Sequence, residues 1–272
     1  IAANTEIGRF YGLQTLRQIA EGQKTIPQLT ITDFPGLDRR GIPVGFHWYR
    51  KREELIRRLT SLKLNFVWNT GSFLNEKFRY RWREALTEAE SEQLADYIEE
   101  MRANFIEPAI CLAPRGKSAA EATSYGDADS VEAVLRRFRE LHAIGVREFG
   151  LTYDDLQNTE QHRLYGDDLD RFGGEIGRAH VHFANEIWEG LQKLDPAARF
   201  TICILYYGQI TSSAEMHLRY YRALAGLDPN IALYSSPTDP EAVQKMIEFT
   251  GRPHLVWDNF WSHLYGYRPA PE

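Results

Sequence analysis

The chain has 272 residues, of which 43% are hydrophobic and 26% are charged, so it can bury a sizeable core and is not a disordered chain. A formal net charge of -6 argues against nucleic acid or an anionic membrane as a partner. No apolar run approaches the roughly 18 residues that a membrane span needs. The length suits one large α/β domain, since barrels of about 250 residues often form single domains.

The first part of the chain, residues 1–41, is predicted to lead into a separate barrel domain at residues 42–272. Residues 8–21 carry apolar side chains at nearly helical spacing and are followed by Gly22, which predicts an amphipathic helix that ends there. Residues 28–33 alternate apolar and polar side chains before a Pro-Gly pair. This pattern predicts an edge strand or a hairpin arm followed by a turn.

From residue 42 onward, short apolar runs alternate with amphipathic helical patterns. Strands are predicted at 42–46, 64–68, 105–112, 148–153, 199–205, 231–234 and 254–257, and helices at 50–62, 87–104, 130–144, 172–194, 213–225 and 240–250. Such alternation implies parallel strands with right-handed crossovers. Seven successive strands favour an α/β fold of the (β/α)8 TIM-barrel type over an open sheet. Residues 262–272 are loop-like, so an eighth strand is not found within this chain.

The fourth predicted strand ends in two adjacent carboxylates, Asp154 and Asp155. Such a pair is costly for folding, because like charges repel each other and burial penalises both. In a barrel, the carboxyl ends of the strands carry the active site. A simpler interpretation makes Asp154 a solvated loop residue and Asp155 a helix N-cap. Other predicted strand ends carry Trp, Tyr, Asn and Asp, a set that fits a polyhydroxylated ligand.

The sequence indicates no metal and no cofactor. Cys111 and Cys203 lie in apolar runs that predict strands, so buried free thiols are expected. His180 and His182 lie two positions apart on a predicted helix and would point to nearly opposite sides, which makes a shared metal improbable. No glycine-rich phosphate loop and no G-x-S-x-G motif is present.

Five segments, taken in chain order, resemble the catalytic region of a known family. They are GRFYGLQTLRQIA (8–20), IPQLTITDFPGLDRRGI (26–42), WRE (82–84), LTYDD (151–155) and WDN (257–259). The family is glycoside hydrolase family 84, which includes bacterial β-N-acetylglucosaminidases and protein O-GlcNAcases. The resemblance implies a (β/α)8 barrel, a carbohydrate or glycoconjugate substrate, and a preceding small α/β domain outside this chain.

The resemblance also implies a mechanism: retaining, substrate-assisted hydrolysis of 2-acetamido-2-deoxy-β-hexosides, in which the acetamido oxygen attacks the anomeric carbon and forms an oxazoline. By position, Asp154 would orient and polarise the acetamido N–H. Asp155 would protonate the glycosidic oxygen and then deprotonate the attacking water. The implied sugar contacts are Gly45, Phe46, Tyr206, Trp257 and Asn259.

Other sugar ligands of the family are missing. No lysine matches the one that the family carries after strand 2, where this chain has residues 70–73, and Leu264 replaces a carboxylate that holds the outer hydroxyls. Two alternatives therefore stay open: a carbohydrate-binding barrel with weakened or lost turnover, and a glycosidase of altered sugar specificity. A third alternative is an enzyme of another class, since a shared barrel does not fix function.

Overall fold

The computed structural model describes residues 1–26, 28–44, 51–70, 76–116, 121–154, 163–207, 215–236 and 240–256. Seven parallel strands form one sheet in the order β1-β2-β3-β4-β5-β6-β7, so every strand pairs with its neighbours in sequence. They are β1 (Gly41–Val44), β2 (Phe66–Asn69), β3 (Glu107–Leu112), β4 (Glu148–Thr152), β5 (Arg199–Cys203), β6 (Ala232–Ser235) and β7 (His254–Val256). The predicted barrel architecture is confirmed, with seven strands in the described part of the chain.

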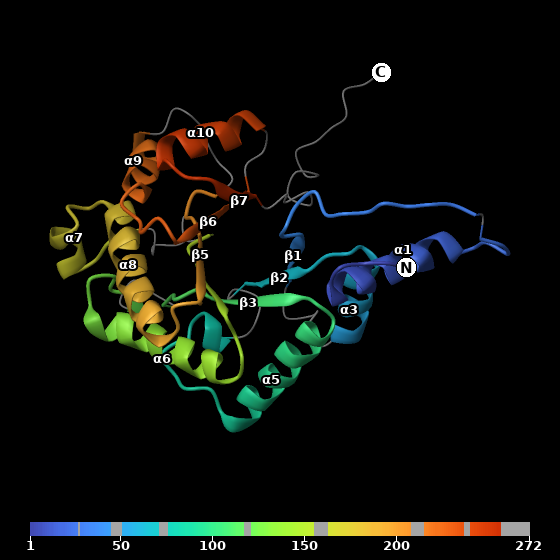
Figure 1. Cartoon of the computed structure of the whole chain (residues 1–272). Coiled ribbons are helices and arrows are strands. Elements are labelled where there is room, and N and C mark those ends of the chain that lie inside the picture. The colour runs from blue at the N-terminus through green and yellow to red at the C-terminus, as the bar shows by residue number, and fades with distance from the viewer. Residues whose placement is uncertain are drawn as a thin grey trace, which may run out of the picture.

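Helices lie around the outside of the curved sheet (Figure 1). They are α3 (Arg52–Ser61), α5 (Glu88–Ala103), α6 (Ala128–Ala143), α7 (Asp167–Arg171), α8 (Ile176–Leu194), α9 (Glu215–Leu224) and α10 (Pro240–Thr250), with a 3₁₀ turn, η1, at Glu76–Phe78. The predicted cap of α5 is confirmed, because Thr87 Oγ accepts from the amide of Glu90 at 3.3 Å and the Glu90 carboxylate accepts from the amide of Thr87 at 2.8 Å. Within the described residues, no helix combines the length and apolarity needed to cross a membrane.

The two faces of the sheet bury different side chains. One face packs against the helices and contributes residues such as Phe149, Leu151 and Ile202. The other face carries a smaller buried cluster, made of Phe66, Trp68, Ala109, Cys111, Cys203 and Tyr234. Because side chains alternate along a strand, this smaller cluster fills the barrel interior. Both cysteines are buried and free, as predicted.

The N-terminal segment packs against the side of the barrel that carries α3. The predicted helix is confirmed as α1 (Glu6–Ala20), which lies beside α3, where Gln18 Nε2 donates to the Ser61 carbonyl at 2.6 Å (Figure 1). The predicted strand at 28–33 is wrong, since the described residues there form no strand. Among the described residues, no strand lies beside this segment to cover its apolar side, and Leu29 and Ile31 remain about half exposed, at 47% and 49%.

A buried ion pair anchors this segment to the amino end of the barrel. Arg39 donates to both carboxylate oxygens of Glu148, at 2.5 and 2.9 Å, and Arg199 donates to the same carboxylate at 3.1 Å. The Glu148 side chain is completely buried, and burial raises its pKa although Arg39 and Arg199 oppose the rise. The connection between residues 1–41 and the barrel is therefore specific.

Candidate active site

The carboxyl end of β4 places Asp154 as the sequence suggested. Tyr153 continues the ladder, donating its amide to the Cys203 carbonyl at 2.9 Å, and its ring packs outward among the helices. Asp154 follows on the opposite side of the chain and is only 7% exposed. Its charge raises the pKa of Cys111 and of Tyr234, two members of the interior cluster, in addition to the larger effect of burial. Asp154 is therefore a buried carboxylate at the mouth of the barrel, and the solvated-loop interpretation is wrong for it.

A second charged residue, Arg115, reaches Asp154 from the segment after β3. Its Nη2 donates to the Asp154 backbone carbonyl and lies 3.6 Å from the carboxylate Oδ1. The Arg115 side chain is 1% exposed, so this is an almost fully buried ion pair. Sequence reasoning missed Arg115. The available signal was a charged residue placed three positions beyond the end of an apolar strand.

Tyr206 lies beyond the end of β5, the strand that neighbours β4. Its carbonyl accepts from the Tyr221 hydroxyl at 2.7 Å, and its ring packs on His217 with centroids 4.1 Å apart. Burial raises the pKa of Tyr206, so its hydroxyl stays protonated and able to donate. The fold thus brings Asp154 and Tyr206 to the ends of two adjacent strands.

The five remaining predicted site residues lie outside the described ranges: Gly45, Phe46, Asp155, Trp257 and Asn259. His180 and His182 do diverge as expected: His180 is buried against Tyr153, whereas His182 lies 3.2 Å from an Arg171 nitrogen at the surface. In the described ranges, no group of three or more His, Cys, Asp or Glu side chains could hold a metal ion.

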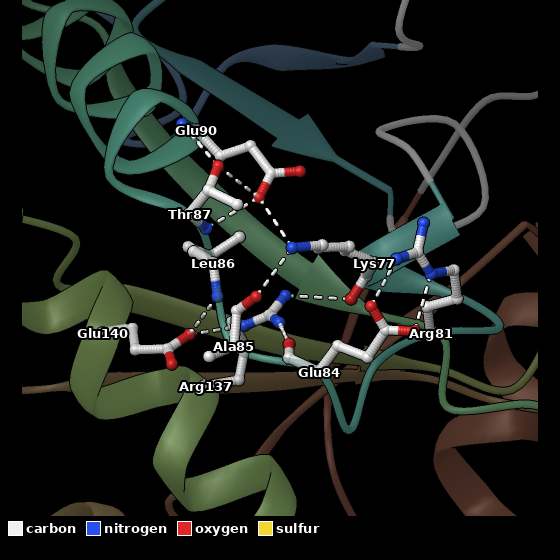
Figure 2. A network of polar contacts seen from close by, with 9 residues as sticks. All are labelled: Lys77, Arg81, Glu84, Ala85, Leu86, Thr87, Glu90, Arg137 and Glu140. Carbon is white, nitrogen blue, oxygen red and sulfur yellow. Dashed lines mark hydrogen bonds and ion pairs between the residues drawn. The ribbon is translucent and has the colours of Figure 1, made fainter.

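The loop after β2 is fixed by a buried polar network, shown in Figure 2. Lys77 donates to the Ala85 carbonyl at 2.7 Å and to the Glu90 carboxylate at 2.9 Å. Arg137 of α6 donates to the carbonyls of Lys77, at 2.9 Å, and Glu84. Lys77 is the lysine nearest in sequence to residues 70–73, where the family that this chain resembles carries a sugar-binding lysine. In this structure its amine is bonded within the loop.

The same network includes α6 and the start of α5. Arg137 Nε donates to Glu140 at 2.8 Å, and Glu140 accepts from the Leu86 amide at 3.4 Å. Arg137 is only 1% exposed. Residues 76–87 are therefore held from two sides, and we refer to this arrangement as the loop clamp.

Comparison with known proteins agrees with this geometry. A model of the beta-N-acetylglucosaminidase family matches residues 45–263, and a model of domain 2 of glycosyl hydrolase family 20 matches residues 1–34. Protein O-GlcNAcase from Rattus norvegicus and from Mus musculus are each 25% identical over 240 residues, which is 83% of this chain and 24% of theirs. The chain thus spans about a quarter of the length of these curated relatives.

A solved structure supports the fold. An O-GlcNAc hydrolase variant from Thermobaculum terrenum superposes with a TM-score of 0.69 at 18% identity, covering 82% of this chain and 48% of that one. At such low identity the similarity shows a shared fold. The family model, in contrast, covers most of the chain, including the segment that carries Asp154. The chain belongs to the beta-N-acetylglucosaminidase family.

Proposed function

We propose that the chain is the catalytic barrel of a retaining glycoside hydrolase that removes 2-acetamido-2-deoxy-β-hexosides of the GlcNAc type. The observation that carries the proposal is the placement of Asp154, a buried carboxylate at the carboxyl end of β4 in a chain of this family. The names of the rat and mouse relatives, both Protein O-GlcNAcase, support a GlcNAc-type substrate.

The proposed mechanism is substrate-assisted. The acetamido oxygen forms a bond to the anomeric carbon while the bond from that carbon to the leaving oxygen breaks. Asp155 gives its proton to the leaving oxygen, and Asp154 accepts a hydrogen bond from the acetamido N–H and stabilises the positive charge that develops there. Water then attacks the anomeric carbon, gives a proton to Asp155 and opens the oxazoline.

Two neighbouring carboxylates suit these separate roles. Like charges push their proton affinities apart, so one can stay ionised while the other holds a proton near neutral pH. Tyr206, at the end of the adjacent strand, is proposed to donate a hydrogen bond at the oxazoline stage, and its raised pKa keeps that proton in place. Gly45, Phe46, Trp257 and Asn259 are proposed to complete the sugar pocket.

The test compares aryl 2-acetamido-β-glucosides that have poor and very good leaving groups. Asp155→Asn should abolish hydrolysis of the first kind and spare the second, because only a poor leaving group needs a proton. Asp154→Asn should slow both kinds, because oxazoline formation is impaired for both. Asp129→Asn, an exposed change on α6, serves as the matched control. Equal losses on both substrates in Asp155→Asn would contradict its role as the general acid.

A carbohydrate-binding barrel without turnover is the second candidate. It is favoured by the structural use of Lys77 in the loop clamp, which leaves that lysine bonded within the protein. A thiazoline that mimics the oxazoline distinguishes the two candidates. Inhibition together with released sugar supports the hydrolase, whereas glycan binding with no released sugar over a panel of GlcNAc, GalNAc and longer acetamido glycans supports the binding protein.

We also propose that residues 1–41 form an arm between the barrel at 42–272 and a small α/β domain. The similarity of residues 1–34 to domain 2 of glycosyl hydrolase family 20 supports this assignment, as do the exposed apolar residues Leu13 and Phe34. Deleting residues 1–35, which leaves Arg39 in place, should keep the barrel folded by circular dichroism. Loss of the folded barrel would contradict the proposed boundary.

A further inference from the structure

We propose that Arg115 is a positioning residue for Asp154, holding its carboxylate ionised and oriented toward the acetamido group of the substrate. The inference rests on the proposed function and adds to it a residue that the family resemblance does not supply. Arg115 follows β3 and Asp154 follows β4, so the contact joins the ends of two adjacent strands. Both side chains are largely buried, at 1% and 10% exposure.

The contact fixes Asp154 at two points. The Arg115 Nη2 group donates to the backbone carbonyl of Asp154 and lies 3.6 Å from its Oδ1 atom. A guanidinium is planar and permanently charged, so a single group can fix the backbone and balance the charge of the carboxylate. Replacing it by a neutral side chain would free both the direction and the protonation of Asp154.

The loop clamp holds Arg115 in turn. The Arg115 amide donates to the Arg79 carbonyl at 3.1 Å, and the Ala113 amide donates to the Phe78 carbonyl at 2.8 Å. Residues 78 and 79 belong to the segment that Lys77 and Arg137 anchor (Figure 2). A continuous series of buried contacts therefore runs from α6 through the loop after β2 to the carboxylate at the end of β4.

The charges around Asp154 make the effect of Arg115 on the pKa of Asp154 measurable. Besides Arg115, Cys111 on β3 and Tyr234 on β6 interact electrostatically with Asp154. Burial raises the pKa of both, so both are neutral near pH 7. Asp155, the next residue in sequence, adds a like charge whenever it is ionised. Removing the Arg115 charge should therefore raise the pKa of Asp154, because an opposite charge that favoured its ionised form is lost.

The experiment measures the Asp154 titration and turnover separately. Carboxyl ¹³C NMR titrations are recorded for the wild type, Arg115→Gln and Arg115→Lys, with Asp154 assigned through Asp154→Asn. Arg115→Gln should move the Asp154 midpoint, and the acid limb of kcat/KM, upward by about one pH unit. It should also lower kcat by about tenfold to a hundredfold, because Asp154 is no longer held in place. Arg115→Lys, which keeps the charge, should leave the Asp154 midpoint close to that of the wild type.

Controls separate this role from a purely structural one. Arg81→Gln removes a half-exposed arginine of the same loop, whose partner is Glu84, and should change neither midpoint nor kcat. If Arg115→Gln does not fold, Arg115→Met removes the charge with a flexible apolar side chain. An unchanged Asp154 midpoint in the folded neutral variant would overturn the inference. Absence of hydrolysis by the wild type would overturn the proposed function alone, since the NMR titration does not need turnover.

Discussion

The imidazole of His180 on α8 lies flat against the ring of Tyr153, with centroids 3.8 Å apart and planes 9° apart. Its Nδ1 lies 3.1 Å from the Tyr220 hydroxyl, which itself accepts from the Leu205 amide at 3.1 Å. Because the hydroxyl already accepts from an amide, its own proton is directed to Nδ1. Tyr153 precedes Asp154 and Leu205 precedes Tyr206, so one buried histidine connects the two strand ends of the candidate site.

His180 should make the stability of the fold depend on pH. Burial lowers its pKa from 6.5 to about 3. Below about pH 6.5, the unfolded chain therefore binds a proton that the folded chain does not, and the free energy of unfolding falls as the pH falls. The slope for one such group is about 1.4 kcal/mol per pH unit, and the contribution is constant above about pH 6.5. Urea unfolding at pH 4.5, 5.5 and 7.5 measures how the free energy of unfolding changes with pH.

The variant His180→Phe should reduce this pH slope by the contribution of one titrating group, about 1.4 kcal/mol per pH unit. It keeps an aromatic ring against Tyr153 and removes the titrating group. It should also cost about 1–3 kcal/mol at pH 7.5, because the buried Tyr220 proton loses its acceptor. Burial also lowers the pKa of His254, to about 4, so His254 adds the contribution of a second proton to the pH slope. That second contribution should remain in His180→Phe. An unchanged slope in His180→Phe would show that this histidine does not titrate on unfolding.

Gly150, in the middle of β4, makes room for the barrel interior. A Cβ atom there would lie 2.6 Å from Cys111 Sγ and 2.7 Å from the far end of the Trp68 ring. Gly150→Ala should therefore destabilise the fold by about 1–3 kcal/mol through overpacking, measured by chemical denaturation. Adding Cys111→Ala should recover part of the loss, since the two sites are in contact. Gly36→Ala, which meets nothing within 4 Å, is the matched control.

The order of strands and helices could be predicted because each element carries its own local signal. Thr87 and Glu90 specify the start of α5 by themselves, through a cap that closes within three residues. The failures occur where the deciding partner is elsewhere. Residues 28–33 have the alternation of a strand, but no strand of the described part of the chain pairs with them. The predicted start of α8 at residue 172 was early, since Gly173 and Gly174 adopt positive φ and separate α7 from α8.

The residues of the candidate site also differ in whether the sequence alone can single them out. Asp154 could be singled out as a candidate because a carboxylate directly after an apolar strand conflicts with burial, a kind of conflict that proteins tolerate mainly at functional sites. Arg115 could not, because its partner is 39 residues away and a single arginine has no pattern. Lys77 shows the opposite case. Its identity suits a sugar ligand, yet only the three-dimensional arrangement shows its amine bonded to Ala85 and Glu90.

Arg39 should be essential for the amino end of the barrel. Arg39→Ala leaves the fully buried Glu148 carboxylate with Arg199, 58% exposed, as its remaining ion-pair partner among the described residues. We expect a loss of about 3 kcal/mol, the low end of the range for breaking a buried pair, because Arg199 remains. The double variant with Glu148→Gln should be more stable than Arg39→Ala alone, since the unbalanced charge is gone. Arg58→Ala, which breaks the exposed pair with Glu54, should stay within about 0.5 kcal/mol of the wild type.

The loop clamp can be tested through Arg137. Arg137→Lys keeps the charge but cannot reach the carbonyls of both Lys77 and Glu84, so at least one buried acceptor loses its donor. Each such loss costs about 1–3 kcal/mol, which denaturation should detect. The variant should also have a local effect that separates the loop from the rest of the fold. Amide hydrogen exchange in residues 76–87 should accelerate more than exchange in α8.

Arg139→Lys is the matched control for this variant, because Arg139 lies on the same helix, is 46% exposed and pairs with Glu132. It should change neither stability nor exchange, as expected for an exposed ion pair. The clamp supports the β3 exit through the Phe78 and Arg79 carbonyls, so protection of the Ala113 and Arg115 amides should also fall in Arg137→Lys. Faster exchange in the loop with full protection of these two amides would mean that the loop clamp fixes the loop but does not hold the site.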